Sequence, residues 1–488
     1  MTSTLTFCGG AGTVTGANFL LDIGLKSSAR NADGSADHSS QTNGLGTKIL
    51  IDCGTLEQDI PSAGRCLPVA TGTAQAGDTA NSAPFPYDVK QIDALLVTHA
   101  HQDHIGRIPR LVRDGFRGAI HSSYPTKDIA AIMFDDALSV MQEHAKEFGC
   151  EVLYDAADIE QALSLWKGCE YHEQFQVGDA SVELLDAGHI LGSAMIRLNR
   201  EGKSIIFSGD IGNTPEPLLR DCESPAGADY IVMESVYGDR IHEGRGERKE
   251  MLRAAIEEAR AHKGVLLVPS FSIERTQILL YELNGMVEDG SMQPIPVYLD
   301  APLASRVTEV FRKYPELFNP AVRKHFARGD DPFSFRGLKI IPTADGSHAI
   351  HLAPNPKVII AGAGMSGGGR VRAHEKYYLG EKSTTLLFVG YQASGTLGRR
   401  IQEGEKKVLI DKEHVHVRAR ISSLTGYSGH ADRDQLLQFI ENVGPSLKKV
   451  FVTMGEPRAS LFLAQRARDF LGVETLVPAR GASYDIEF

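Results

Sequence analysis

The chain has 488 residues, of which 42% are hydrophobic and 23% are charged. This is the composition of a folded globular protein, so it excludes a disordered or fibrous chain, and the length predicts two domains. The net charge of −11 excludes a protein that coats nucleic acid with its whole surface, although it leaves room for a local basic groove.

Short apolar strands alternate with helical stretches, which is the pattern of a layered α/β protein. In chain order, strands are predicted at 48–52, 94–98, 204–208, 230–233, 264–269, 296–299, 357–361, 385–390 and 449–453. Helices are predicted at 126–147, 248–261, 274–287, 303–314 and 434–443. No apolar run reaches the roughly 18 residues that a membrane helix needs, so no membrane partner is expected.

Two segments, 26–46 and 62–85, are rich in Gly, Ser, Ala, Asn and Thr and read as long loops or insertions. The first enters strand 48–52 and is expected away from the site described below, whereas the second follows that strand and is expected on the same side as the site. The N-terminus, MTSTLTFCGG, carries no signal-peptide pattern. The six cysteines lie far apart without a C-x-x-C pair, which favours the reducing cytoplasm.

The strongest motif is the cluster His99, His101, Asp103 and His104, directly after the strand predicted at 94–98. Imidazole and carboxylate are ligands that Zn²⁺ prefers. One tetrahedral ion cannot easily use four side chains from so short a loop, so the cluster favours two ions. The alternative is a solvated polar loop, which such crowding makes improbable.

Three further candidates, His189, Asp210 and His430, follow other predicted strands or precede a helix. Alone, each would be read as a structural residue. Their repeated place at strand ends favours a shared site, because loops at the carboxyl ends of strands form the sites of α/β sheets.

Together these residues resemble the metallo-β-lactamase superfamily and, within it, the β-CASP nucleases. The superfamily motifs are Asp52 in LIDCG, the H-x-H-x-D-H cluster at 99–104, His189 in AGHILGSA and Asp210 in FSGD. The β-CASP motifs are Glu234 in MESVYGDR, His374 in GMSGGGRVRAH and His430 in YSGHAD. The segments VPSFSIERTQILLYEL, PVYLDAPLA and GYQASGTLGR agree as well. One departure is Met454-Gly455-Glu456, where the family often has His-Gly-Glu.

The resemblance implies an αββα metallo-β-lactamase sandwich with an inserted α/β β-CASP cap. The expected domains are 1–236 and 384–488 for the sandwich, the second part with a C-terminal RNA-specificity motif, and 237–383 for the cap. It also implies two zinc ions per chain. One zinc would be held by His99, His101 and His189, and the other by Asp103, His104 and His430, with Asp210 bridging both.

The resemblance further implies catalytic roles for Asp103 and for Asp52, which would orient the metal-binding cluster. It also implies a catalytic role for Glu234 and His374, which are expected side by side near the leaving group. Two zinc ions can supply a bridging hydroxide for phosphodiester hydrolysis. A His374 imidazolium polarised by Glu234 could then protonate the leaving oxygen. The alternative for this pair is a buried ion pair that joins the two domains.

The glycine-rich turn before His374 is the expected substrate contact, because such turns expose backbone N–H groups to phosphate. The expected contacts are Gly364, Ser366, Gly367, Gly368 and Arg370; the family usually has serine where Ala363 stands. Residues 356–427 hold 12 Lys and Arg against 6 Asp and Glu, which favours a basic groove there.

The combined prediction is a cytoplasmic, zinc-dependent ribonuclease that acts on single-stranded RNA. The sequence does not decide between endonuclease and 5′-exonuclease action, and it leaves a homodimer open. RNA is preferred because His430 resembles the RNA-processing members. The alternatives are a β-CASP DNA nuclease and a non-catalytic RNA-binding subunit of a processing complex. A thioesterase or lactamase would share the superfamily ligands but would not need Glu234, His374 or the cap.

Overall fold

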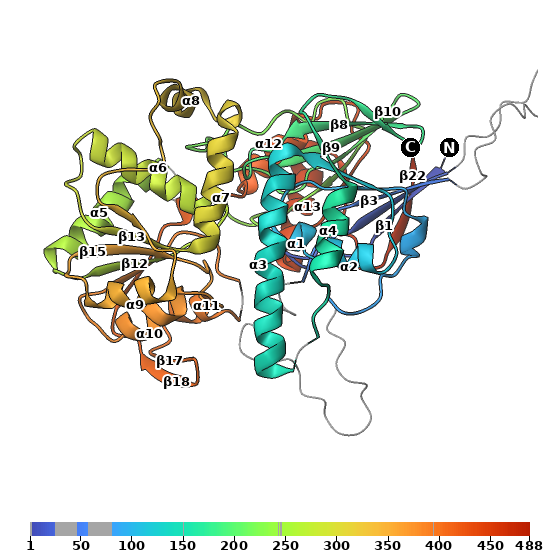
Figure 1. Cartoon of the computed structure of the whole chain (residues 1–488). Coiled ribbons are helices and arrows are strands. Elements are labelled where there is room, and N and C mark those ends of the chain that lie inside the picture. The colour runs from blue at the N-terminus through green and yellow to red at the C-terminus, as the bar shows by residue number, and fades with distance from the viewer. Residues whose placement is uncertain are drawn as a thin grey trace, which may run out of the picture.

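The computed structural model describes residues 2–24, 46–56, 81–149, 151–242, 244, 246–393 and 395–488. Two mixed β-sheets with helices outside them form one part of the molecule, and a parallel sheet with its own helices forms the other (Figure 1). Among the described residues, no helix combines the length and apolar character that crossing a bilayer requires.

The first sheet of the sandwich has seven strands in the order β22-β1-β2-β3-β4-β5-β6. Its antiparallel half joins the two ends of the chain, because β1 pairs with β22, whereas β3 to β6 run parallel. The strands are β1 (Thr2–Phe7), β2 (Phe19–Ile23), β3 (Thr47–Ile51), β4 (Ala94–Leu96), β5 (Ala119–Ser123), β6 (Trp166–Cys169) and β22 (Ser483–Glu487).

The second sheet of the sandwich also has seven strands, in the order β21-β20-β11-β10-β9-β8-β7. Here β10, β11, β20 and β21 run parallel and the others antiparallel. The strands are β7 (Phe175–Val177), β8 (Ala180–Asp186), β9 (Ala194–Arg200), β10 (Lys203–Phe207), β11 (Tyr230–Met233), β20 (Lys449–Val452) and β21 (Glu474–Leu476).

The two sheets pack face to face through an apolar core that includes Phe7, Phe19, Phe207 and Phe451. The Phe7 and Phe451 rings, one from each sheet, lie 5.3 Å apart. On the outer faces, α3 (Tyr124–Phe148) and α4 (Ala156–Leu165) contact the first sheet, and α13 (Pro457–Leu471) contacts the second. The remaining helices of this part are α1 (Gln102–Ile105), α2 (Ile108–Arg113) and α12 (Arg433–Glu441). The predicted αββα sandwich is confirmed.

The cap has a six-stranded parallel sheet in the order β14-β13-β15-β12-β16-β19. Its strands are β12 (Val265–Pro269), β13 (Val297–Asp300), β14 (Leu338–Ile340), β15 (Lys357–Ala361), β16 (Thr385–Phe388) and β19 (Arg420–Ser423). The helices that accompany it are α5 (Arg248–Ala261), α6 (Arg275–Glu288), α7 (Pro302–Lys313), α8 (Pro320–Ala327), α9 (Ala344–Leu352), α10 (Val371–Tyr378) and α11 (Leu397–Gln402). A hairpin of β17 (Lys407–Ile410) and β18 (Glu413–His416) extends from this domain.

The sheet pairing corrects the expected end of the cap at residue 383. Strand β16 pairs with β12, and β19 pairs with β16, so both complete the cap sheet. The chain returns to the sandwich only after β19, where α12 and β20 follow. The boundary depends on which sheet accepts an apolar strand, and the local sequence of that strand does not encode this.

Most of the segments 26–46 and 62–85 lie outside the described residues, so their predicted positions stay predictions. The described residues on either side of each segment meet. Ile23 is paired with Thr47 in the β2–β3 register. The Asn81 amide accepts a hydrogen bond from Leu56 N and donates one to Leu56 O, at 2.8 and 2.9 Å.

Candidate metal centre and the pocket beside it

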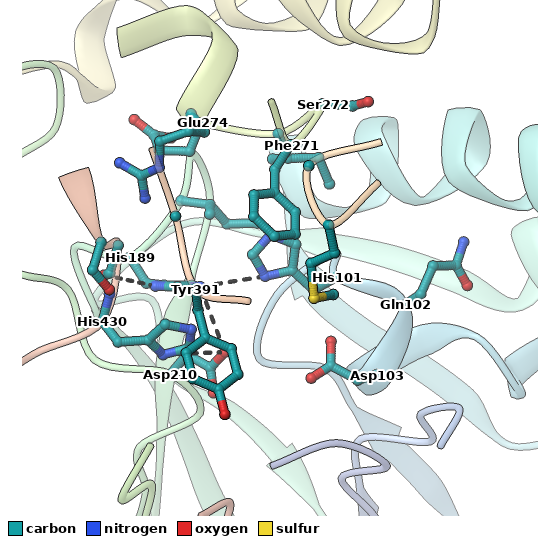
Figure 2. A pocket seen from close by; sticks show the side chains of 18 of the residues that line it. His101, Gln102, Asp103, His189, Asp210, Phe271, Ser272, Glu274, Tyr391 and His430 are labelled. Atoms are coloured by element: carbon teal, nitrogen blue, oxygen red, sulfur yellow. Dashed lines mark hydrogen bonds and ion pairs between the residues drawn. The ribbon is translucent and has the colours of Figure 1, made fainter. Parts of the chain in front are cut away.

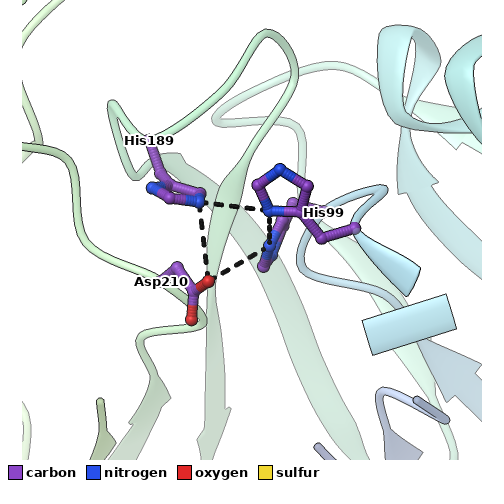
Figure 3. Close-up of side chains that lie close together, drawn as sticks. His99, His189 and Asp210 are labelled. Atoms are coloured by element: carbon purple, nitrogen blue, oxygen red, sulfur yellow. Dashed lines mark hydrogen bonds and ion pairs between the residues drawn. The ribbon is translucent and has the colours of Figure 1, made fainter. Parts of the chain in front are cut away.

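Three imidazoles and a carboxylate converge where β4, β8 and β10 end. The Nε2 atom of His99 lies 3.0 Å from His101 Nδ1, and His189 Nε2 lies 3.3 Å from the same atom. Asp210 Oδ2 is 3.4 Å from His99 Nε2 and 3.5 Å from His189 Nε2 (Figure 3). One ligand atom from each of these four residues lies within 4.8 Å of the others, so the set can hold a metal ion.

A second group of potential ligands lies on the other side of the Asp210 carboxylate. His104 Nε2 is 3.4 Å from Asp210 Oδ1 and 3.8 Å from Asp103 Oδ2. Both His104 Nε2 and Asp210 Oδ1 are buried and have no hydrogen-bond partner. Buried polar atoms are nearly always paired, so two unpaired atoms that face each other fit a cation between them. The donor set is therefore chemically suited to a second ion.

Asp52 holds His104 in the orientation that such an ion needs. Its carboxylate accepts hydrogen bonds from Thr98 N and Thr98 Oγ1, both at 2.8 Å, and from His104 Nδ1 at 2.7 Å. The proton of His104 is thereby kept on Nδ1, which leaves the lone pair of Nε2 free for a metal. This contact agrees with the orienting role that the sequence predicted for Asp52.

Glu234 and Gly429 hold the remaining two histidines. His189 Nδ1 donates to Gly429 O at 2.9 Å. His430 Nδ1 donates to Glu234 Oε1 at 3.1 Å and lies 3.9 Å from Asp210 Oδ2. Glu234 also accepts a hydrogen bond from Ile211 N at 2.7 Å, so it ties the loop after β10 to the His430 turn. All seven predicted ligands are thus brought to one place.

Burial and neighbouring charges favour the metal-binding protonation states at His99, His101, His189 and Asp210, but not at the other ligands. Burial lowers the pKa of His99, and it lowers the pKa of His101 and His189 well below the usual range. Burial alone would raise the pKa of Asp210, but the imidazoles of His104 and His99 hold it well below its usual value. Metal ligands must be neutral imidazole and ionised carboxylate, so the group of His99, His101, His189 and Asp210 is preorganised for a cation.

Burial alone would lower the pKa of His104 and His430, but the carboxylates of Asp210 and Asp52 hold the pKa of His104 well above its usual value, and Glu234 with Asp210 raises the pKa of His430 to about 9. Burial also raises the pKa of Asp103. An ion held by His104 and His430 would therefore have to displace their protons.

His374 does not lie beside Glu234, which corrects the predicted pair. Its Nε2 donates to Asp300 Oδ2 at 2.7 Å, and its Nδ1 lies 3.1 Å from His351 Nε2. Both ring nitrogens are therefore used inside the cap, and the side chain is fully buried. The residue that Glu234 contacts is His430 instead. Proton transfer from His374 to a leaving group has no support in this geometry.

The glycine-rich turn contributes less to the site than predicted. Gly364 lines the pocket described next, together with Ala363 and Met365. In contrast, the Ser366 hydroxyl donates to buried Glu375, and neither Gly367 nor Gly368 is among the lining residues. The Arg370 guanidinium donates to Asp300, Ile341 O and Pro342 O.

Several cations of the expected basic groove pair with acidic neighbours. Arg399 pairs with Glu403 and Arg400 with Glu405, each within α11 and the turn that follows it. Arg420 pairs with Glu258 of α5. These three arginines are therefore paired in the structure, and only the pair of Arg420 with Glu258 draws on an acid outside the stretch.

A pocket of about 280 Å³ opens directly over the metal centre. His101, Asp103, His189, Asp210 and His430 form one wall. The rest of the lining includes loops that follow β12, β15 and β16 of the cap, and Figure 2 shows Phe271 and Tyr391 from these loops close to the metal-binding side chains. The cap residues that sequence analysis missed are Phe271, Ser272, Glu274, Arg275 and Tyr391. A signal existed, since VPSFSIERTQILLYEL places Phe271 and Arg275 just after an apolar strand.

Met454 lies beneath the metal centre. It is buried and lines a small cavity with Asp52, Thr98, His104 and Glu234. Its thioether packs against Gly10, where an added Cβ would come within 2.6 Å of the sulfur. The side chain that replaces the family histidine therefore packs as an apolar residue behind Asp52.

Three known domain families match successive parts of the chain. Residues 47–266 match a beta-lactamase superfamily domain, and residues 276–401 match the Beta-Casp domain. Residues 414–478 match the Zn-dependent metallo-hydrolase RNA specificity domain. The second match runs past residue 383 through β16, in agreement with the sheet pairing.

Relatives with curated names cover most of the chain. Ribonuclease TTHA0252 of Thermus thermophilus is 35% identical over 89% of this chain and 92% of its own length. Transcription termination factor FttA of Methanocaldococcus jannaschii is 31% identical over 88% of this chain and 67% of its own length. A crystal structure of a protein of unknown function from Enterococcus faecalis V583 covers 100% of both chains with a TM-score of 0.52 and 13% identity, which is a likeness of fold alone.

Proposed function

The chain belongs to the β-CASP group of the metallo-β-lactamase superfamily, and we propose that it is a zinc-dependent ribonuclease that hydrolyses phosphodiester bonds in single-stranded RNA. The observation that carries the proposal is the pair of buried atoms His104 Nε2 and Asp210 Oδ1, which face each other without a hydrogen-bond partner beside a pocket lined by Asp210 and by the cap. The match to an RNA specificity domain at 414–478 and the name of the Thermus relative support RNA as the substrate.

In this proposal, two zinc ions are held by the ligands predicted from the sequence. His99, His101 and His189 would hold one ion, Asp103, His104 and His430 would hold the other, and Asp210 would serve both. Bound zinc supplies Lewis acidity, which lowers the pKa of water and neutralises the charge of a phosphodiester.

The protein's own part is to keep these ligands fixed and in the right protonation state. Asp52 keeps the proton of His104 on Nδ1, and Gly429 O does the same for His189. Glu234 accepts from His430 Nδ1 and so fixes that ring. The turn that carries His430 is itself fixed, because Asp432 forms a capping box with Gln435 at the start of α12.

The pocket favours a single strand over a duplex. Its volume of about 280 Å³ accommodates a group of roughly nucleotide size between the metal centre and the cap. A duplex keeps its bases paired and stacked, so it would have to unpair and extrude a nucleotide to fill such a space. An unpaired nucleotide can enter from the open side.

The test is incubation of the purified chain and zinc with end-labelled RNA and DNA of the same sequence. We expect cleavage of RNA and two zinc ions per chain by elemental analysis. Asp210→Ala should abolish cleavage with the fold retained, whereas Asp93→Ala, which only removes an acceptor for Lys48 N, should not. Preferential cleavage of DNA would assign the chain to DNA nucleases. RNA binding without cleavage would assign it a non-catalytic role, and no more than one tightly bound metal ion would refute the binuclear centre.

A further inference from the structure

The cap contributes a short segment, Ser270 to Arg275, that lines the pocket between the end of β12 and the start of α6. Two of its side chains have the chemistry of nucleic-acid contacts. Phe271 presents an aromatic ring and Arg275 a guanidinium group. The contacts of Phe271 and of Arg275 show whether each side chain only fills the interior of the protein or is also open to a ligand.

The Phe271 ring is seated in a slot formed by two glycines. A Cβ atom added at Gly364 would lie 2.6 Å from Phe271 Cδ2, and one added at Gly390 would lie 2.8 Å from Cε2. Any side chain at either glycine would therefore displace the ring. The ring is only partly buried and lines the pocket, so it is a fixed aromatic surface next to the metal centre (Figure 2).

Arg275 carries a buried positive charge. Its side chain is 6% exposed, and its Nη1 atom is buried without a hydrogen-bond partner. Within the described part of the chain, the guanidinium group forms no ion pair within 4.0 Å. Buried arginines are normally paired; Arg200, for comparison, is 2% exposed and pairs with Asp179 at 2.9 Å. A buried charge left unpaired is costly, so its retention calls for an anion from elsewhere.

The position of Arg275 connects it to the metal centre. A Cβ atom added at Gly429 would lie 2.7 Å from Arg275 Nη2 and 3.4 Å from His189 Cε1. The guanidinium group therefore packs against the turn that carries His430 and contacts His189. The two nearest acidic groups do not neutralise it by contact. Glu274 accepts from Leu191 N, and burial raises its pKa well above the usual range, while Glu216 acts on Arg275 only as a charge at longer range.

We propose that Phe271 and Arg275 form a nucleotide subsite of the cap, in which the Phe271 ring stacks on one base of the strand and the Arg275 guanidinium binds a neighbouring backbone phosphate. This subsite deepens the proposed function and rests on it for the identity of the strand. Stacking on an aromatic ring tolerates any base, and a guanidinium fork matches two phosphate oxygens. The subsite requires an unstacked base, which only a single strand offers.

The first experiment measures binding of a hydrolysis-resistant, short phosphorothioate oligouridylate to the zinc-loaded full chain as a function of salt. Phe271→Ala should weaken binding roughly 5- to 150-fold without a change in salt dependence, the range expected for loss of one stacked base. Phe271→Trp should restore it. Arg275→Met should lower the slope of log affinity against log salt by about 0.7, the value for one phosphate contact in a single strand.

A matched control is available on the surface of α13. There Arg466 lies 5.0 Å over the ring of Phe470, which is 66% exposed, and neither residue lines the pocket. Arg466→Met and Phe470→Ala remove the same two groups from the protein and should leave both affinity and salt slope unchanged. An abasic ribose-phosphate chain of equal length separates the two contacts, since it should be sensitive to Arg275→Met and insensitive to Phe271→Ala.

Thermal unfolding without RNA separates a binding role from a structural role for Arg275. An unpaired buried cation destabilises the folded state, so Arg275→Met should keep or raise the unfolding temperature while RNA binding falls. Arg275→Lys keeps the charge and should retain the salt slope. Unchanged binding by both Arg275→Met and Phe271→Ala would overturn the subsite, even in an enzyme that cleaves RNA. Binding with the expected signature by a chain that cleaves no RNA would instead overturn the proposed function and leave the subsite in place.

Discussion

Replacing Asp52 with asparagine should remove one metal ion and leave the other. Asp52 has a positive φ of 58°, a conformation that asparagine tolerates well, so the backbone is not strained by the change. The side chain also keeps its shape. What changes is the direction of one hydrogen bond, because an amide nitrogen donates where the carboxylate oxygen accepted.

This reversed hydrogen bond changes the tautomer of His104. In the native protein His104 Nδ1 donates to Asp52 Oδ2 at 2.7 Å. An amide N–H at that place donates to Nδ1 instead, so the imidazole proton moves to Nε2, the atom that faces Asp210 Oδ1. A protonated Nε2 cannot ligate. Loss of such a supporting contact weakens metal binding by about 10- to 100-fold, and each buried donor left without an acceptor costs about 1–3 kcal/mol.

Competition with a chromophoric chelator measures the affinity of each zinc ion. The site of His99, His101 and His189 should keep its affinity, and only the ion held through His104 should weaken. Asp229→Asn is the matched control, because Asp229 accepts a backbone hydrogen bond from Ser204 N at 2.9 Å but contacts no histidine of the centre. If Asp52→Asn binds both ions as tightly as the native chain, the tautomer argument is wrong.

Two further predictions concern the interior of the cap. His374→Ala should lower stability by about 1–3 kcal/mol, because it leaves Asp300 and His351 without their shared partner, while turnover on RNA stays unchanged; a large loss of turnover in a stable variant would restore the predicted catalytic role. Glu375 accepts a hydrogen bond from Ser366, and burial raises the pKa of Glu375 from 4.5 to about 8. Between these two pH values the carboxyl group is protonated in the folded state and releases its proton on unfolding. Its contribution to stability is therefore present below about pH 4.5 and lost as pH rises through about 8, and Glu375→Gln should flatten this fall in thermal unfolding temperature.

Local sequence was sufficient to predict the elements that carry a strong apolar period. Strands β11 and β15 and helix α5 have the same bounds as predicted, and the other predicted elements differ by a few residues at their ends. Sheet membership was not predictable in the same way. The pairing of β16 with β12 and of β19 with β16 joins segments far apart in the chain, and a single apolar run carries no mark of its neighbour.

The residues of the candidate site also differ in how well the sequence predicts them. The convergence of the candidate metal ligands was predictable because several ligand-type side chains are crowded into six positions at 99–104, and His189, Asp210 and His430 match motifs of the family that the sequence resembles. The expected pair of Glu234 and His374 failed because the contact of a single polar residue depends on tertiary packing. His374 lies on the first turns of α10, and there Asp300 of β13 is the acceptor within reach.

One topological rule accounts for both walls of the pocket. Every parallel strand next to the pocket delivers its functional residue at the carboxyl end, as α/β sheets do in general. These residues are Asp52 after β3, His99 after β4, Asp210 after β10, Glu234 after β11, Phe271 after β12, Gly364 after β15 and Tyr391 after β16.

The rule also explains which predicted contacts fail. Gly364 lies close to the end of β15 and lines the pocket, whereas Ser366 and Arg370, further along the same loop, turn to Glu375 and Asp300 inside the cap. In the loop after β15, the residue near the strand end reaches the site, and the residues further along turn toward the packed side of the domain. The apolar run at 264–269 is a predicted strand, so the position of Phe271 just after its end was visible in the sequence. Strand ends had been considered there only for metal-ligating side chains.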